Sequence, residues 1–196
     1  MPFFTQKRVS SGNMLSKYYS KSKHGIFQCL IAASFLIIRK YYYEVQMIEY
    51  NIVATTSNDL DELINIRIVA MKSSLEKIGR FDIERAKKRL VNSFDAKYTK
   101  KITVDNALIG FYALRPVDNY LKLDHLYIIP EYQEKGIGSK IIASIISEGA
   151  ELNKNIKLCA LIDSEANNFY VKHGFILTKK DEFDNYYEYI INSMSI

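Results

Sequence analysis

LKLDHLYIIPEYQEKGIGSK, residues 121–140, predicts a strand, a short turn at Pro130–Tyr132 and the start of a helix. Two glycines, Gly136 and Gly138, stand where the helix begins, so the backbone can come close to a ligand there. The first amides of a helix have no intrahelical partner, and the helix dipole places positive charge at the same end. The stretch therefore predicts a phosphate-binding site.

The spacing of the glycines excludes the two commonest phosphate loops. A Walker loop needs Lys and then Ser or Thr directly after its second glycine, and a dinucleotide-binding loop needs a third glycine three residues on. Here Gly138 is followed by Ser139, Lys140 and Ile141, so neither pattern fits. Gln-x-x-Gly-x-Gly after a strand that ends in proline instead resembles motif A of the GNAT superfamily of acyl-CoA-dependent N-acetyltransferases. The resemblance implies that the loop amides hold the pyrophosphate of acetyl-CoA, used as a co-substrate.

The positive charge of the chain is confined to its N-terminal part. At 196 residues the chain is long enough for one domain with a full core. Of its net charge of +5, residues 1–46 contribute seven Lys and Arg against one acid, which leaves 20 basic and 21 acidic residues in 47–196. A domain with this balance has no positive field of the size that nucleic acids require, so no nucleic-acid partner is expected.

Cysteine and histidine are too scattered to indicate a metal site or a disulfide framework. Cys29 and Cys159 lie far apart in apolar runs, and neither belongs to a Cys-x-x-Cys pattern. The three histidines, His24, His125 and His173, are equally far apart. We therefore expect no metal cofactor.

Residues 1–46 form a basic N-terminal extension with a short apolar run, Ile26–Ile38. This run is shorter than the ~20 residues of a membrane-spanning helix, so no stable membrane span is expected. A signal peptide is disfavoured because Arg39 and Lys40 follow directly. Three interpretations stay open: an untranslated stretch before a native start at Met47, a helix docked on the domain, and a membrane-surface anchor. The catalytic domain is expected at 47–196 and, because it uses acetyl-CoA, in the cytoplasm.

Hydrophobic periodicity from Met47 onward predicts the order β-α-α-β-β-β-α-β-α-β-β. The expected strands span 48–55, 98–104, 107–114, 120–129, 156–162, 175–178 and 186–191, and the expected helices begin near 60, 83, 136 and 164. Asp105–Asn106 predicts a two-residue hairpin turn, and 115–119 a further turn. This order predicts an α/β (α+β) fold with a mixed, mostly antiparallel sheet of six to seven strands and helices on both faces. It is also the order of the GNAT fold, over essentially all of 47–196.

A second motif supports the same resemblance. Glu165–Phe175 resembles the Ala-x-x-x-Tyr-x-x-x-Gly-Phe segment that follows the fifth strand in GNAT enzymes. The resemblance implies a gap between the fourth and fifth strands that holds pantetheine. The backbone of Leu126, Tyr127 and Ile128 would pair with pantetheine there and polarise the thioester carbonyl.

Acetyl transfer to an amine requires deprotonation of the amine, stabilisation of the oxyanion and protonation of the departing thiolate. Tyr170 aligns with the tyrosine that donates this last proton in many family members; the alternative is a tyrosine that only packs on its helix. His125 occupies a position where some members carry a histidine that handles the amine proton. The alternatives are a hydrogen-bonded sheet histidine with a water relay, and Asp124, which strand alternation points to the opposite face unless a bulge intervenes.

One position departs from the family pattern. Family members often have asparagine at the end of the fifth strand, where it bonds the pantetheine amides, but Asp163 stands there. An ionised carboxylate only accepts hydrogen bonds, so Asn167 is the candidate to replace it. The cofactor-binding residues implied by the resemblance are Leu126, Tyr127, Ile128, Gln133, Glu134, Lys135, Gly136, Ile137, Gly138, Ser139, Lys140 and Asn167.

Acceptor choice in this fold usually depends on the loop between the first two helices and on the last strands. The expected acceptor-binding residues are Arg80, Phe81 and Asp124. Arg80 could meet a carboxylate, and the acids among residues 181–184 could attract an ammonium group, although a solvated loop is the alternative for both. The leading prediction is acetylation of a primary amine, of a small molecule or a peptide. The alternatives are a protein N-terminus or lysine, a charged tRNA, and a non-catalytic acyl-CoA-binding module; a homodimer stays open.

Overall fold

The computed structural model describes residues 48–191, and the predictions about residues 1–46 lie outside this part of the chain. Its elements follow the predicted order. The strands are β1 (Asn51–Ala54), β2 (Thr99–Val104), β3 (Ala107–Val117), β4 (Tyr120–Ile128), β5 (Asn155–Leu161), β6 (Ile176–Lys180) and β7 (Asp184–Tyr189), and the helices are α2 (Leu60–Lys77), α3 (Ile83–Ser93), α4 (Ile137–Glu151) and α5 (Ala166–Lys172), with short 3-10 turns η1 (Ser57–Asp59) and η2 (Pro130–Tyr132).

The seven strands form one sheet in the order β1-β2-β3-β4-β5-β7-β6. Every neighbouring pair is antiparallel except β4 and β5, which pair in parallel because α4 connects them as a crossover. The predicted fold class, a mixed and mostly antiparallel sheet of six to seven strands, is confirmed. The predicted Asp105–Asn106 hairpin is confirmed as well, since both residues have the positive φ angles of a two-residue turn.

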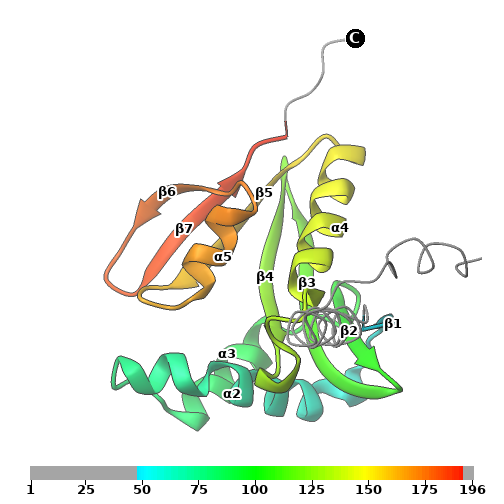
Figure 1. Ribbon diagram of the computed structural model, residues 1–196, viewed down its shortest axis with the longest axis vertical. Helices are drawn as coiled ribbons and strands as arrows, with labels where there is room; N and C mark the ends of the chain where they lie inside the picture. The colour runs from blue at the N-terminus through cyan, green and yellow to red at the C-terminus, as the bar shows by residue number, and fades with distance from the viewer. Residues whose placement is uncertain (1–47, 192–196) are drawn as a thin grey trace, which may run out of the picture. The chain divides into compact units, whose positions relative to one another are not determined.

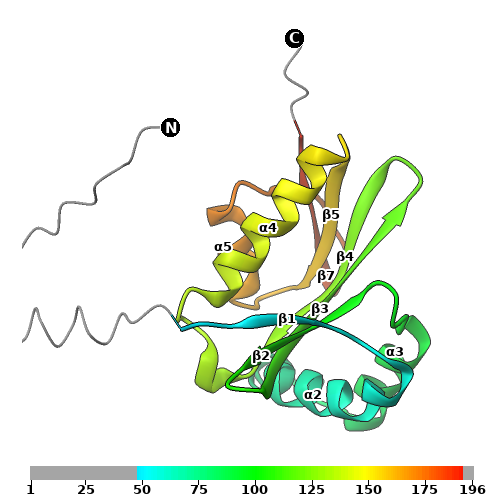
Figure 2. The same ribbon diagram turned by 90° about the vertical axis from the view of Figure 1, so that its right-hand side faces the viewer.

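The helices cover both faces of the sheet, as predicted (Figures 1 and 2). On one face α2 and α3 pack over β3 and β4, around the fully buried Leu63, Leu90 and Phe111. On the other face α4 and α5 pack over the centre of the sheet, around a larger cluster that includes Ile141 and Ile156. The β4–β5 region is therefore enclosed by elements that come from distant parts of the chain.

The parallel pairing of β4 and β5 ends early. It joins Tyr120–Leu123 to 155–158 and goes no further, although both strands continue. A register shift in the β3–β4 pairing occurs at the same place, because Ala113 pairs with His125 and Leu114 pairs with Leu123. Asp124 is therefore the extra residue of a β-bulge, a feature that bends its strand. Beyond the bulge β4 separates from β5, and their backbone groups are left open to a ligand.

Several predicted boundaries were wrong by a few residues, for identifiable reasons. The turn predicted at 115–119 is limited to 118–119, because β3 continues through Pro116 to Val117, opposite Tyr120. Proline has no N–H to donate to a neighbouring strand. Pro116 is tolerated because it lies close to the hairpin turn at 118–119, where few ladder hydrogen bonds are needed. The bounds of the last two strands also differ from the prediction. β6 continues to Lys180 and β7 begins at Asp184, so the loop between them is limited to 181–183.

Gly110 sets the spacing between β3 and the open part of β4. A β-carbon at this position would collide with the Tyr127 carbonyl oxygen and would lie 3.2 Å from Ile128 Cα. Gly110→Ala is therefore expected to lower the free energy of unfolding by about 1–3 kcal/mol, since the two strands must move apart. Urea denaturation of both proteins measures this difference. An unchanged midpoint and slope would mean that the strand spacing is not set by this glycine.

Candidate active site

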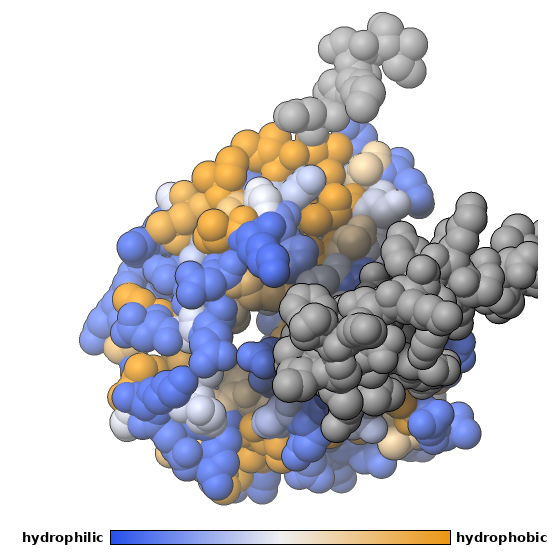
Figure 3. Space-filling view, in the orientation of Figure 1, coloured by the Kyte–Doolittle hydropathy of each residue, from blue (hydrophilic) through white to orange (hydrophobic). Residues whose placement is uncertain are grey.

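A cavity of about 670 Å³ occupies the space between the separated parts of β4 and β5. In the space-filling view the molecule is hollowed near its centre, beside β4 and between α5 and α2 (Figure 3). Most of the predicted site residues line this cavity: Asp124, His125, Leu126, Tyr127, Ile128, Gln133, Glu134, Gly136, Gly138, Ser139 and Tyr170. One hollow thus joins the backbone of β4, the start of α4 and the helix α5.

The loop before α4 is held in a shape that leaves the first helix amides open. Gly136 is the N-terminal cap of α4 and has φ of 80°, a left-handed conformation suited to glycine. Glu134 is also left-handed, with φ of 58°. The Gln133 side chain donates a hydrogen bond from Nε2 to the Ile128 carbonyl oxygen at 2.7 Å. Gln133 therefore ties the loop to the end of β4, and the backbone is left to meet a phosphate.

Four predicted cofactor residues do not line the cavity. The Ile137 side chain is buried in the core, so only its backbone amide is placed at the helix start. Lys135 and Lys140 lie over the rings of Tyr132 and Tyr50. Asn167 donates both amide hydrogens to the carbonyl oxygens of residues 161 and 164. The roles of all four in cofactor binding stay predictions.

Tyr170 lies where β4, β5 and α5 meet. Its side chain is only 7% exposed, and it lines the cavity. Burial, and to a smaller extent the nearby Tyr127, raises the pKa of its hydroxyl well above the ordinary value. Among the described residues no hydrogen-bond acceptor takes its proton. The Tyr170 hydroxyl therefore faces the cavity and stays protonated at any physiological pH.

His125 is held as a neutral imidazole. The single hydrogen of the Ser93 hydroxyl is donated to the Arg89 carbonyl oxygen at 2.8 Å. With the Ser93 hydrogen assigned to this carbonyl, Ser93 Oγ is the acceptor for His125 Nε2, also at 2.8 Å, and the lone pair is assigned to Nδ1. Nδ1 is buried and has no hydrogen-bond partner within residues 48–191. Burial, together with the positive charge of Arg67, lowers the pKa of His125 to about 4.

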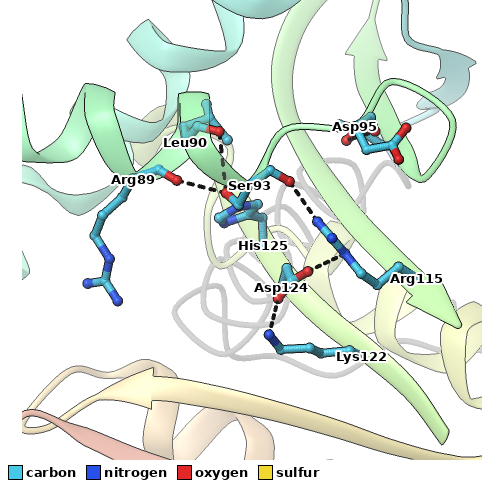
Figure 4. A network of polar contacts seen from close by, with 9 residues as sticks. Arg89, Leu90, Ser93, Asp95, Arg115, Lys122, Asp124 and His125 are labelled. Carbon is cyan, nitrogen blue, oxygen red and sulfur yellow. Dashed lines mark hydrogen bonds and ion pairs between the residues drawn. The ribbon is translucent and has the colours of Figure 1, made fainter. Parts of the chain in front are cut away.

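The Asp124 carboxylate forms ion pairs with two cations. Its carboxylate lies 2.6 Å from Arg115 Nε and 2.8 Å from Lys122 Nζ, and its side chain is only 12% exposed. Arg115 also donates a hydrogen bond to the Ser93 carbonyl oxygen at 2.6 Å. Figure 4 shows how this network joins the bulge of β4 to the last turn of α3. The bulge that would interrupt strand alternation is present, and Asp124 and His125 belong to one polar network.

The two loops predicted to choose the acceptor contact each other. The Arg80 guanidinium stacks over the ring of Phe183, 3.6 Å from its centroid, which joins the α2–α3 loop to the β6–β7 loop. One turn earlier, Lys77 Nζ lies 3.4 Å from Glu165 Oε1 on the rim of the cavity. Neither Arg80 nor Phe81 lines the cavity itself, so their contact with an acceptor stays a prediction.

Part of this sequence is similar to a known protein family and to a curated protein. Residues 100–177 match the family model described as an acetyltransferase (GNAT) domain. A curated relative, the spermidine N(1)-acetyltransferase of Thermoplasma acidophilum, is 34% identical over 84 residues, which cover 41% of this chain and 51% of the relative. The matched part of the chain, residues 100–177, is a GNAT acetyltransferase domain. It spans about half the length of this curated relative.

Solved structures share the GNAT fold at lower identity. The PaiA N-acetyltransferase of Thermoplasma acidophilum, solved in complex with coenzyme A, superposes with a TM-score of 0.61 at 21% identity and covers 71% of this chain and 98% of its own. The ribosomal-protein-S18-alanine N-acetyltransferase of Escherichia coli gives a TM-score of 0.58 at 16% identity, over 73% and 94% of the two chains. These likenesses establish the fold of the described residues.

The GNAT cavity also contains side chains that the sequence did not assign to it. Ala70, Met71 and Ser74 reach it from α2, Cys159 from β5 and His173 from the cap position at the end of α5. Helical spacing could have grouped the three α2 residues, and His173 stood within the second motif. Nothing in the sequence pointed to Ser93, because its contact with His125 exists only where α3 meets β4 in space.

Other features of the described GNAT domain lie apart from this site. A smaller cavity of about 260 Å³ lies among β2, β3 and α4 and contains none of the predicted residues. Within residues 48–191 no helix is long and apolar enough to cross a bilayer. In the same part of the chain, no group of three or more His, Cys, Asp or Glu side chains is arranged to hold a metal ion.

The lowered pKa of His125 makes stability depend on pH. Because its folded pKa of about 4 lies below the ordinary value of about 6.5, the unfolded chain takes up the proton first as the pH falls. The stability that His125 contributes is therefore present above about pH 6.5 and is lost between about pH 6.5 and 4. Urea denaturation across this range is expected to show a smaller loss for His125→Gln. A His125 ring resonance that titrates near pH 6.5 by NMR would contradict this assignment.

Proposed function

We propose that this chain is an N-acetyltransferase that moves the acetyl group of acetyl-CoA to a primary amine of a small molecule. The observation that carries the proposal is the single cavity shared by the open backbone of β4, the first amides of α4 and the Tyr170 side chain. The activity of the curated relative, a spermidine N(1)-acetyltransferase, favours a small-molecule acceptor. The expected place of the reaction is the cytoplasm.

Acetyl-CoA would be held by two parts of the cavity. The amides of Ile137, Gly138 and Ser139, at the start of α4, suit the pyrophosphate. Beyond the bulge, Leu126 and Ile128 of β4 have no β5 partner, so the backbone of Leu126 and the Ile128 N–H can pair with the pantetheine amides. Tyr170 then lies on the opposite wall, where the sulfur would be.

The reaction is a direct displacement through a tetrahedral intermediate. The amine nitrogen attacks the thioester carbonyl carbon, a C–N bond forms, and the C–S bond then breaks. Backbone N–H groups of β4 stabilise the oxyanion, and Tyr170 donates its proton to the leaving thiolate. CoA leaves as the free thiol, and the proton released by the amine restores the tyrosine.

The amine proton has three candidate acceptors, and the contacts favour water. Asp124 is neutralised by two ion pairs. His125 already uses Nε2 in its bond to Ser93, and its pKa of about 4 makes it a weak base for an ammonium group. We therefore infer a water relay along the cavity, with direct transfer to His125 as the second route.

Tyr170→Phe tests the proposed acid. Removing the hydroxyl keeps the ring and its packing, so acetyl-CoA affinity is expected to stay the same while kcat falls by a factor on the order of 10²–10⁴. Free-thiol release measures turnover, and calorimetry measures binding. Tyr189→Phe, which changes a tyrosine outside the cavity, serves as the control and is expected to keep full turnover. Equal turnover in the Tyr170 and Tyr189 variants would remove Tyr170 from the chemistry.

A panel of amines tests the function itself. Polyamines, amino acids, aminoglycosides and peptides are incubated with the full chain and acetyl-CoA, and CoA release is followed. The proposal expects release that depends on both the acceptor and the enzyme, with the acetylated amine found by mass spectrometry. Binding of acetyl-CoA without transfer to any amine would favour the acyl-CoA-binding module instead.

A further inference from the structure

The helix that carries Tyr170 is too short to hold itself in place. α5 has seven residues, Ala166–Lys172, and isolated helices of fewer than about 12–15 residues are marginal in water. Its N-terminal cap residue, Glu165, makes no side-chain hydrogen bond to the first turn. In the turn before it, Asp163 has φ of 62°, a left-handed conformation that costs free energy in residues other than glycine. Contacts outside the helix must therefore fix the place of Tyr170.

The Asn167 side chain makes such contacts in three directions. Its amide nitrogen donates hydrogen bonds to the carbonyl oxygens of Leu161, at 2.9 Å, and Ser164, at 2.7 Å. Its oxygen accepts hydrogen bonds from Asn185 Nδ2 at 2.8 Å and from the Tyr187 hydroxyl at 2.9 Å. One side chain thus joins the end of β5, the β5–α5 turn and β7 to the first turn of α5, which lies against these strands (Figure 1).

The hydrogen-bonding capacity of the Asn167 amide is used within the protein. A carboxamide offers two hydrogens and two lone pairs, and all four have partners. The orientation of the amide is assigned from these partners, since two carbonyl oxygens can only accept and require the nitrogen on their side. Asn167 also does not line the cavity. The contacts therefore favour a structural use of this amide over a bond to pantetheine.

Two routes connect Asn167 to Tyr170. Asn167 precedes Tyr170 by three residues, so the two are neighbours on successive turns of α5. Tyr187, whose hydroxyl bonds to Asn167, also packs its ring beside the Tyr170 ring, with the centroids 6.1 Å apart. Tyr187 and Asn185 are both buried, and satisfied polar networks away from water hold their geometry firmly. A shift of the Asn167 side chain would therefore move the Tyr170 hydroxyl within the cavity.

We propose that Asn167 is a positioning residue, which holds α5 so that the Tyr170 hydroxyl meets the sulfur of bound acetyl-CoA. The inference rests on the proposed function and adds to it the residue on which the acid depends. It gives Asn167 a different role from the pantetheine contact that the family resemblance implies.

Asn167→Asp tests the inference with little change in side-chain size. The carboxylate would place an oxygen against two carbonyl oxygens, so the first turn of α5 is expected to shift. We expect kcat to fall by about tenfold to a hundredfold while acetyl-CoA affinity stays the same, because a misplaced acid slows the chemistry. Free-thiol release and calorimetry measure the two quantities. Weaker acetyl-CoA binding with unchanged kcat is the result expected of a pantetheine ligand, and it would overturn the inference.

Asn168→Asp is the matched control. Asn168 is the next residue of α5, is exposed, and has no hydrogen-bond partner for its side chain among the described residues. The same charge is added there, so kcat is expected to stay unchanged. An equal kcat in the Asn167 and Asn168 variants would contradict the inference.

Tyr187→Phe provides a milder second variant. It removes one of the four hydrogen bonds and keeps the ring beside Tyr170, so it is expected to fold and to lower kcat by about threefold to tenfold. If Asn167→Asp does not fold, Tyr187→Phe carries the test. An unchanged kcat in this variant would then overturn the inference.

A double variant separates positioning from a general loss of structure. If Asn167 acts through Tyr170, its substitution has nothing left to misplace once the hydroxyl is absent. Asn167→Asp combined with Tyr170→Phe is therefore expected to keep kcat within about twofold of Tyr170→Phe alone. Two losses that multiply in the double variant would show that Asn167 acts independently of Tyr170.

A spectroscopic measurement keeps the inference apart from the proposed function. The full chain is labelled with ¹³C at the tyrosine ring carbon Cζ, and the Tyr170 resonance is identified by its absence in Tyr170→Phe. Its chemical shift is expected to change in Asn167→Asp and to stay the same in Asn168→Asp. If this change is found but no amine of the panel is acetylated, the positioning stands and only the proposed function fails. An unchanged Tyr170 resonance in Asn167→Asp overturns the inference whatever the turnover.

Discussion

The structure depends on the point where β4 and β5 stop pairing. Their ladder ends at Leu123, and Asp124 bulges out of the β3–β4 register at the next residue. Two ion pairs hold the Asp124 carboxylate, and the Arg115 partner also bonds the last turn of α3. The same polar contacts that keep β4 bent therefore keep its backbone open, and the open backbone is what a pantetheine arm could use.

Arg67 Nε and His125 Nδ1 are buried without a hydrogen-bond partner within residues 48–191. Buried polar groups are normally hydrogen-bonded, and the exceptions concentrate where a ligand completes the network. The rest of the core is well packed around residues such as Phe111 and Ile142, which are fully buried.

The fold and the cofactor half of the site were predictable because they depend on local patterns. Strand and helix periodicity predicted the element order, and the glycines at 136 and 138 predicted the helix start that we propose binds phosphate. The acceptor half was not, because it is assembled from α2, α3 and two loops that meet only in space. Ser93 is an ordinary residue of an amphipathic helix in the sequence; only its contact with His125 gives it a role. Arg80 stacks on Phe183, and the sequence could not predict this contact because the two residues are more than a hundred positions apart.

The central claim is that the start of α4 and the open edge of β4 bind acetyl-CoA in one cavity. Titration calorimetry of acetyl-CoA into the full chain, compared with Gly138→Ala, tests it most directly. A β-carbon at Gly138 would lie 3.4 Å from the Phe169 ring, an ordinary contact, so the variant should fold while its side chain narrows the approach to the helix amides. The account predicts one equivalent of acetyl-CoA bound by the parent chain and affinity reduced by about tenfold or more in the variant. Absence of binding to the parent chain, or equal affinity in both proteins, would contradict it.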